Sequence, residues 1–264
     1  MLDIKKNRGF RYGDGLFETI KIHNSKPLFI ERHLERLRVS ADILGLNCNK
    51  VSLDFVNQYL QKVINVVGDL DGVLRIYLYR NSLSKGYLPL DPEDSDIIMN
   101  YEALEPSPKT IKDNLIGISS FERPINIVGS KTLSSLHFVQ ARIESYKHNL
   151  FDCLMLNHKG EVCEFSSGNI FFIDKNNIVK TPKSNGYIIN GVMRQVLIET
   201  INDKLIHNLI TNYPFLFTNC NKEATDAILA SQNVIEGAFF KADIFDAKHV
   251  IFTNASIGLV SVTF

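Results

Sequence analysis

Two side chains in the middle of this chain are of types that carry out amine chemistry. Lys131 stands in residues 129–133 (GSKTL), and Glu164 opens residues 164–172 (EFSSGNIFF). A lysine whose ammonium form is destabilised can form a Schiff base with an aldehyde and shuttle protons. A carboxylate can hold a protonated ring nitrogen, which makes the ring a better electron sink. Pyridoxal 5'-phosphate (PLP) needs both side chains, so the pair suggests PLP chemistry.

Three further blocks accompany this pair: residues 11–19 (RYGDGLFET), 33–37 (HLERL) and 190–195 (NGVMRQ). In this order the blocks resemble the fold-type IV PLP enzymes, which include branched-chain and D-amino-acid aminotransferases and 4-amino-4-deoxychorismate lyase. The resemblance runs from about Arg8 to the C-terminus. It implies an α/β (α+β) fold of two domains, similar to D-amino-acid aminotransferase, with PLP held between the domains of a homodimer.

The resemblance assigns roles to three charged residues. Lys131 would be the catalytic residue and would also bind PLP covalently, while Glu164 would bind its ring nitrogen. Arg36 would bind the cofactor phosphate, for which a guanidinium offers two parallel charge-assisted donors. A surface interpretation stays open, in which Arg36 belongs to an ordinary salt-bridged helix face together with Glu31, Arg32, Glu35 and Arg38.

Two further segments would hold the phosphate. A helix opening at Gly191 would present the backbone amides of Val192 and Met193, because unpaired amides and the helix dipole favour an anion. Relatives in the fold-type IV group often carry a threonine where this chain has Met193, so only backbone donors are expected there. The third element would be the C-terminal loop with Ala255 and Ser256.

Four residues match positions that contact the substrate in fold-type IV enzymes. Tyr12 and Phe17 would line the substrate pocket, although core packing is an equally good account of Phe17. Lys85 and Tyr87 lie in a Lys-Gly-Tyr segment that resembles a loop able to meet a substrate carboxylate.

Apolar spacing predicts a mixed α/β pattern. Gly45 and Ser52 are predicted to end one helix and to cap the next. Strands are expected over 16–22, 73–79, 97–101, 116–120, 250–253 and 258–263 and at several places between 153 and 180, and helices over 30–44, 53–67 and 136–146 and after Gly191. We predict a small N-terminal domain (1–103), a linker with two prolines (104–110) and a larger C-terminal domain (111–264) that contains the PLP lysine.

The start of the chain differs from the usual fold-type IV pattern. In that pattern more residues precede the RGFRYGDGLFET block, which begins here at Arg8. We therefore expect the small domain to lack its first strands and to expose an edge of its sheet.

Composition excludes several classes of function. Twenty-nine basic residues balance twenty-nine acidic ones, which leaves no broad basic surface for nucleic acid or an anionic membrane. The chain has no apolar segment of transmembrane length and no metal-ligand spacing among its four cysteines and seven histidines. A cytoplasmic protein with reduced thiols is expected.

The predicted function is that of a PLP-dependent aminotransferase acting on an amino acid and a 2-oxo acid, of the branched-chain or D-amino-acid type. One alternative is 4-amino-4-deoxychorismate lyase, which releases pyruvate and 4-aminobenzoate and which residues 80–90 and 190–195 favour. A second alternative is a PLP-binding protein whose shortened N-terminus has impaired its catalysis.

Overall fold

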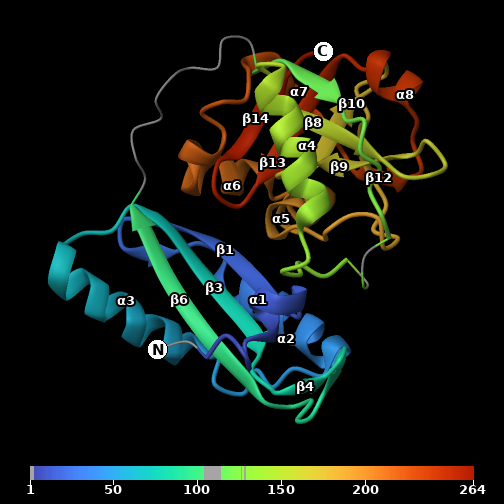
Figure 1. Cartoon of the computed structure of the whole chain (residues 1–264). Helices are drawn as coiled ribbons and strands as arrows, with labels where there is room; N and C mark the ends of the chain where they lie inside the picture. The colour runs from blue at the N-terminus through green and yellow to red at the C-terminus, as the bar shows by residue number, and fades with distance from the viewer. Residues whose placement is uncertain (1–2, 104–113, 126, 128) are drawn as a thin grey trace. The chain divides into compact units, whose positions relative to one another are not determined.

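The computed structural model describes residues 3–103, 114–125, 127 and 129–264, which form two compact units (Figure 1). The first unit comprises Met1–Pro108 together with Ser130–Ser135, and the second comprises Lys109–Gly129 together with Leu136–Phe264. The predicted linker at 104–110 lies outside the described residues. Lys131 was expected in the larger C-terminal domain. The segment Ser130–Ser135, called the lysine strip below, instead groups by its contacts with the first unit.

The first unit is built on an antiparallel sheet of order β2-β1-β3-β6, whose strands β1, β3 and β6 lie side by side in Figure 1. Strand β1 runs antiparallel to β3 from Gly15, opposite Tyr79, to Ile22, opposite Gly72. The elements are α1 (Arg8–Tyr12), β1 (Gly15–His23), β2 (Lys26–Pro27), α2 (Ile30–Leu44), α3 (Leu53–Val67), β3 (Gly72–Arg80), β4 (Ser84–Lys85), β5 (Leu88–Pro89) and β6 (Ser95–Ala103).

The predicted signals at the ends of the two long helices are confirmed. Gly45 follows α2 with a φ of 61°, a left-handed conformation that glycine adopts without strain. The Ser52 side chain caps α3 by accepting a hydrogen bond from the amide of Phe55 at 3.1 Å. Both helices bury apolar side chains, such as Leu34 and Leu60, in the core of the first unit.

The edge of β1 opposite β3 is covered by short segments. Strand β2 pairs only with Ile22 and His23, and the Leu28 amide donates to the carbonyl of Lys21 at 2.9 Å. The lysine strip takes the other end of this edge, through an isolated bridge between Leu16 and Thr132. This edge of the sheet is therefore partly occupied, and the strip that occupies it carries Lys131.

The second unit contains a five-stranded sheet of order β12-β11-β10-β13-β14 and a three-stranded sheet of order β7-β8-β9. Phe165, Phe172 and Phe252 lie in its core and are at most 1% exposed. The elements are β7 (Ile116–Ile118), α4 (Leu136–Lys147), β8 (Asp152–Leu156), β9 (Val162–Phe165), β10 (Asn169–Ile173), β11 (Val179–Pro182), α5 (Val192–Asn202), α6 (Ile206–Asn212), η2 (Pro214–Leu216), α7 (Lys222–Ala230), β12 (Val234–Gly237), α8 (Lys241–Phe245), β13 (His249–Asn254) and β14 (Gly258–Val262).

Helix α4 is confirmed, but the apolar residues whose spacing predicts it do not face the core. The helix buries Ala141 and Ser145 instead. The exposed fractions of the spaced residues are 69% for Leu136, 48% for Val139, 42% for Ile143 and 82% for Tyr146. We call these four residues the α4 stripe.

No helix among the described residues combines the length and apolar character that crossing a bilayer requires. The part of the chain that the structure describes also holds no group of three or more His, Cys, Asp or Glu side chains placed to bind a metal ion. Its cysteines are free thiols, and Cys153 and Cys163 are buried.

Candidate active site

Lys131 is held by backbone hydrogen bonds to the beginning of β1. The Phe17 amide donates to the Lys131 carbonyl at 3.0 Å, and the Leu133 amide donates to the Gly15 carbonyl at 2.9 Å. The Nζ of Lys131 lies 4.1 Å from the centre of the Phe17 ring, within the range of a cation–π contact. The structure therefore brings together two of the predicted site residues, Lys131 and Phe17.

The Gly-Asp-Gly turn before β1 supports the lysine strip. Gly13 ends α1 with a φ of 67°, and a Cβ on this residue would lie 2.9 Å from the Cα of Ser134. A side chain there would be strained by its backbone conformation and would push against the strip. The glycine is thus required by the close approach of the turn to the segment that carries Lys131.

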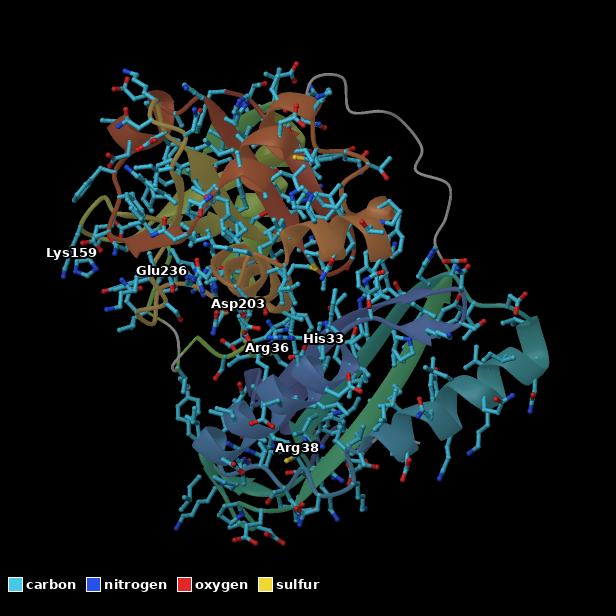
Figure 2. The ribbon with its side chains drawn as sticks, turned by 180° about the vertical axis from the view of Figure 1, so that it is seen from behind. His33, Arg36, Arg38, Lys159, Asp203 and Glu236 are labelled. Atoms are coloured by element: carbon cyan, nitrogen blue, oxygen red, sulfur yellow. The ribbon has the colours of Figure 1, made fainter. Side chains whose placement is uncertain are left out.

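Arg36 is bound to a buried carboxylate of β1, that of Glu18. Its Nε lies 2.7 Å from Oε1 of Glu18 and its Nη2 lies 2.5 Å from Oε2. His33 contributes a further contact, with Nδ1 2.7 Å from Oε2 of Glu18. Figure 2 shows His33 and Arg36 close together and Arg38 away from them. Arg38 pairs instead with Glu35 at 3.8 Å.

The charges in this cluster are set by burial and by mutual contact. Burial opposes ionisation of Glu18, but the Arg36 charge and the His33 contacts outweigh it and lower the pKa of Glu18 to about 2. Burial lowers the pKa of His33, and the charges of Arg36 and Lys131 lower it further against the pull of Glu18. His33 is therefore neutral at pH 7, so its Nδ1–H donates to Glu18. Its Nε2 is an acceptor that is buried without a partner among the described residues.

Glu164 lies on β9 of the second unit and is 2% exposed, so it is not a surface residue at a sheet edge. Nε of Arg123 donates to its Oε1 at 2.8 Å, and Nδ2 of Asn169 donates to its Oε2 at 3.2 Å. The Ile189 amide donates to both oxygens, at 3.1 and 3.0 Å. The carboxylate is thus fixed in direction by a cation and two neutral donors.

The N-terminus of α5 lies beside this carboxylate cluster within the second unit. Gly191 is the N-cap, and no side chain caps the first turn, which begins with the buried Val192 and Met193. A Cβ on Gly191 would collide with the side-chain oxygen of Asn169, whose amide group binds Glu164. The predicted phosphate residues 191–193 are therefore connected to Glu164 through Asn169.

The C-terminal loop that contains Ala255 and Ser256 is attached to the turn that follows Glu164. The Asn254 side chain accepts a hydrogen bond from the Ser256 amide at 3.0 Å and donates to the Ser167 carbonyl at 3.0 Å. Asp152, which is fully buried, in turn accepts hydrogen bonds from the hydroxyls of Ser166 and Ser167. Polar contacts therefore link the loop to the turn after β9 and, through Asp152, to β8.

The predicted substrate residues form two separate groups in the first unit. Tyr12 and Tyr87 lie with ring centres 5.5 Å apart, and the Tyr12 hydroxyl donates to the Gly86 carbonyl at 3.2 Å. Lys85 belongs to the same short hairpin on strand β4. Phe17 lies beside Lys131 and stacks on Tyr77 with ring centres 6.3 Å apart.

Four polar residues of the two clusters were not among the predicted site residues: Glu18, His33, Arg123 and Asn169. Two of them left a signal in the sequence. Glu18 is a charged residue at an inward position of the alternation in β1, and His33 lies one helical turn before Arg36. Arg123 left no local signal, because its partner Glu164 is far away in the chain.

The profile of the amino-transferase class IV family matches residues 15–211. The chain belongs to the class IV aminotransferase family. D-alanine aminotransferase of Staphylococcus aureus strain N315 is 26% identical over 239 residues, which cover 90% of this chain and 82% of that relative. The match to this relative extends over both units of the chain.

Solved structures agree with this membership. A candidate 4-amino-4-deoxychorismate lyase from Legionella pneumophila shares 26% identity and a TM-score of 0.77, covering 99% of this chain and 86% of its own. An aminotransferase from Brucella abortus, bound to PLP, has the same fold at 19% identity and a TM-score of 0.76, covering 99% of this chain and 84% of its own. The predicted fold class and family are confirmed.

The protonation of His137 predicts how stability depends on pH. Burial and the charge of Arg123 lower the pKa of His137 from 6.5 to about 4. Between these values the unfolded chain binds a proton that the folded chain does not, so the free energy of unfolding should fall as the pH is lowered from 6.5 to 4. For one proton the free energy of unfolding changes by at most ~1.4 kcal/mol per pH unit. The contribution of His137 should be smaller than this limit, because the side chain is only partly buried.

Urea titrations at a series of pH values measure this slope. We expect His137→Gln to lower this slope by up to the amount that corresponds to one bound proton. His207→Gln, at an exposed position of α6, is the matched control for loss of an imidazole. Equal slopes for the wild type and His137→Gln would contradict the prediction.

Proposed function

We propose that this class IV protein is a PLP-dependent aminotransferase that moves an amino group between an amino acid and a 2-oxo acid. The observation that carries the proposal is the position of Lys131, whose backbone is fixed on β1 in the same unit as the buried Glu18–His33–Arg36 cluster. An amine nucleophile needs a fixed place and a controlled charge environment, and this unit provides both. Family membership supports the same reaction.

The residues of the second unit fit a phosphorylated pyridine. Nη2 of Arg123 and Oγ1 of Thr253 are buried and have no partner among the described residues, so donors are available that an anionic ligand would satisfy. The first turn of α5 lacks a side-chain cap, and Gly191 leaves no room for a side chain next to Asn169. These features match an anion-binding helix N-terminus.

PLP, when bound, supplies a conjugated ring that accepts the electron pair left when a proton leaves the substrate. We propose that the Lys131 amine would hold PLP covalently and that, when free, it would carry the proton of the substrate Cα. Because His33 is neutral, it adds no positive charge to that of Arg36 near the Lys131 amine. Glu164 would accept a hydrogen bond from the protonated ring nitrogen, and Arg123 would keep that carboxylate oriented.

Phosphate binding is proposed for Arg36, for the backbone of residues 191–193 and for the loop at Ala255 and Ser256. Arg36 is oriented by Glu18, so its fork is held in one direction before any ligand arrives. Tyr12, Phe17, Lys85 and Tyr87 are proposed to contact the substrate. An ammonium at Lys85 suits a substrate carboxylate.

A homodimer is the proposed assembly, and a cytoplasmic location remains a prediction from the sequence. The α4 stripe offers a surface for the second copy, since four apolar side chains at helical spacing stand exposed on one helix. Exposed apolar patches of this kind mark interaction sites. The resemblance to dimeric fold-type IV enzymes indicates that the partner is another copy of this chain.

The runner-up function is 4-amino-4-deoxychorismate lyase. Similarity to the Legionella protein at 26% identity supports it, as does the segment 190–195. Product identification decides between the two: D-alanine with 2-oxoglutarate should yield pyruvate and glutamate in an aminotransferase, whereas aminodeoxychorismate should yield pyruvate and 4-aminobenzoate in a lyase. Absorption of visible light on mixing with PLP but no product from either assay would favour the impaired PLP-binding protein.

Lys131→Ala is expected to abolish turnover while PLP still binds without a covalent bond, because the phosphate contacts remain. Borohydride reduction of the PLP-treated wild type, followed by peptide mapping, should place the phosphopyridoxyl group on Lys131. Lys159→Ala, an exposed lysine of the second unit shown in Figure 2, should leave both results unchanged. A phosphopyridoxyl group on a different lysine would end the assignment.

Arg36→Gln is expected to weaken PLP binding by about 1.5–3 kcal/mol, the usual value of a hydrogen bond to a charged group. The same substitution also removes the partner of the buried Glu18, so it should be repeated in a Glu18→Gln background. Loss of PLP affinity in both backgrounds indicates phosphate binding. If the loss disappears in the double variant, Arg36 only neutralises Glu18. Arg38→Gln, on the exposed face of α2, is the control.

The double variant Val139→Glu/Ile143→Glu should weaken dimerisation by roughly 10-fold or more, because it places charges in the centre of an apolar interface. Sedimentation velocity over a range of concentrations measures the effect. Val66→Glu, which charges an 82% exposed valine of α3, is the matched control. A monomeric wild type, or unchanged sedimentation of the double variant, would exclude the α4 stripe as the interface.

A further inference from the structure

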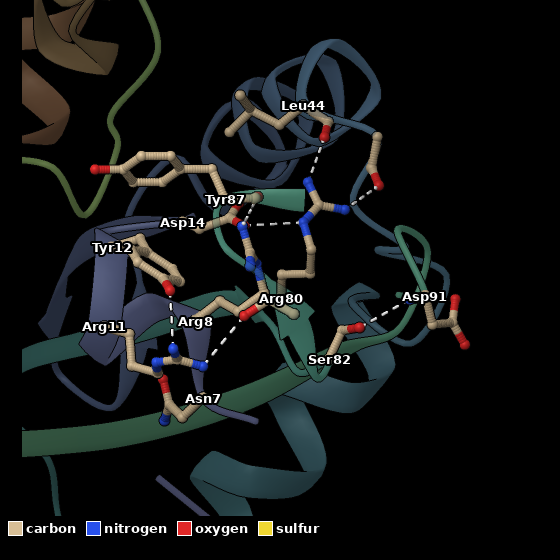
Figure 3. Close-up of polar contacts among 12 residues, drawn as sticks. Asn7, Arg8, Arg11, Tyr12, Asp14, Leu44, Arg80, Ser82, Tyr87 and Asp91 are labelled. Carbon is tan, nitrogen blue, oxygen red and sulfur yellow. Dashed lines mark hydrogen bonds and ion pairs between the residues drawn. The ribbon is translucent and has the colours of Figure 1, made fainter. Parts of the chain in front are cut away.

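Asp14, in the Gly-Asp-Gly turn, joins two buried arginines of the first unit (Figure 3). Its Oδ2 lies 2.7 Å from Nε of Arg8 and 3.0 Å from Nε of Arg80. Arg8 is 4% exposed and Arg80 is 6% exposed. One carboxylate thus offsets part of the charge of two guanidinium groups, and each of these has donors left to contact another segment.

One of the remaining N–H donors of Arg8 binds the hairpin formed by β4 and β5, which is called the Tyr87 hairpin below. Its Nη2 donates to the backbone carbonyl of Tyr87 at 2.6 Å. The Tyr12 ring covers the same guanidinium, with its centre 4.8 Å from Cζ, and also lies against Tyr87. Arg8 therefore connects the turn before β1 to the tip of the hairpin.

Arg80 connects the same carboxylate to the end of α2. Its Nη2 donates to the Leu44 carbonyl at 2.6 Å and its Nη1 donates to the Gly45 carbonyl at 3.0 Å. A cation at this end satisfies carbonyls that the helix leaves unpaired. Since α2 also carries His33 and Arg36, Asp14 is connected both to the helix of the charged cluster and to the Tyr87 hairpin.

Besides the Arg8 bond, the Tyr87 hairpin accepts two exposed hydrogen bonds, from the Tyr12 hydroxyl to the Gly86 carbonyl and from Nη1 of Arg11 to the Ser84 hydroxyl, each at 3.2 Å. Its two strands contain two residues each, and hairpins of this size are marginally stable on their own. Tyr87 is 84% exposed and Leu88 and Leu90 are each 65% exposed, so burial of apolar surface does little to hold it. A charge-assisted bond to a backbone carbonyl fixes the hairpin while leaving its side chains available to a ligand.

We propose that Arg8, together with Asp14 and Arg80, positions the Tyr87 hairpin so that Lys85 and Tyr87 select the substrate. The inference rests on the proposed function, in which these two hairpin residues contact the substrate. The arginines act through the hairpin and are positioning residues. Loss of the Arg8 contact should therefore affect substrate affinity more than the chemical step.

Arg8→Gln tests the proposal in the full-length protein. Asp14 keeps Arg80 as its partner in this variant, so its carboxylate is not left without a cation. Amide hydrogen exchange in residues 83–90 should become on the order of 10-fold faster, while exchange in β1 and β3 stays unchanged. In kinetic assays KM should rise on the order of 10-fold, with kcat within about 2-fold of the wild type. Visible absorbance after PLP addition should not change.

Two further variants make the result specific. Arg8→Lys keeps a positive charge next to Asp14 but lacks the planar fork needed to reach Tyr87 as well, so it should behave like Arg8→Gln. Arg75→Gln, which breaks the Arg75–Glu102 pair of the same sheet without touching the hairpin, should match the wild type. Wild-type exchange and KM in Arg8→Lys would show that charge alone matters and would overturn the proposal.

The outcomes separate this inference from the proposed function. Unchanged exchange in residues 83–90 of Arg8→Gln would overturn the positioning role, whether or not the protein is active. Faster exchange with a loss of kcat but an unchanged KM would also overturn it, because the hairpin would then not select the substrate. A wild type that neither binds PLP nor turns over substrate refutes the proposed function, and the exchange result still reports on the Arg8 contact.

Discussion

Backbone pairing at the edge of β1 is the constraint on which the first half of the candidate site depends. The lysine strip has no helix or long strand of its own, and its position follows from hydrogen bonds to Gly15 and Phe17. This pairing requires the Gly-Asp-Gly turn, because Gly13 approaches the strip too closely for any side chain. The reactive amine and the turn motif, far apart in the chain, are thus parts of one local structure.

The second constraint is a carboxylate on the inward face of β1. Burying Glu18 without partners would cost several kcal/mol. This cost is offset only if α2 places Arg36 and His33 within hydrogen-bonding distance of Glu18. The charged cluster therefore sets the register of the helix against the sheet. Burial, together with the charges of Arg36 and Lys131, lowers the pKa of His33 against the pull of Glu18, so the imidazole is neutral.

In the second unit buried polar contacts orient the chemical groups. Glu164 points into a cluster made by Arg123, Asn169 and the Ile189 amide, which come from three different segments. The next turn is held by Asp152 through two serine hydroxyls, and Asn254 attaches the C-terminal loop to it. Polar contacts in a buried setting give such a site a single arrangement, because each unmade hydrogen bond would be costly.

Local patterns in the sequence were sufficient for the family and for most strands and helices, and they pointed to Lys131, Glu164 and Arg36, whose roles stay predictions. Gly45 and Ser52 marked their helix ends because turn conformation and capping depend on neighbouring residues alone. Tertiary structure alone revealed the partners of these residues, such as Glu18 for Arg36 and Arg123 for Glu164, and turned the α4 stripe outward. Ion pairs and burial depend on which distant segments meet in space, and that information is not contained in local spacing.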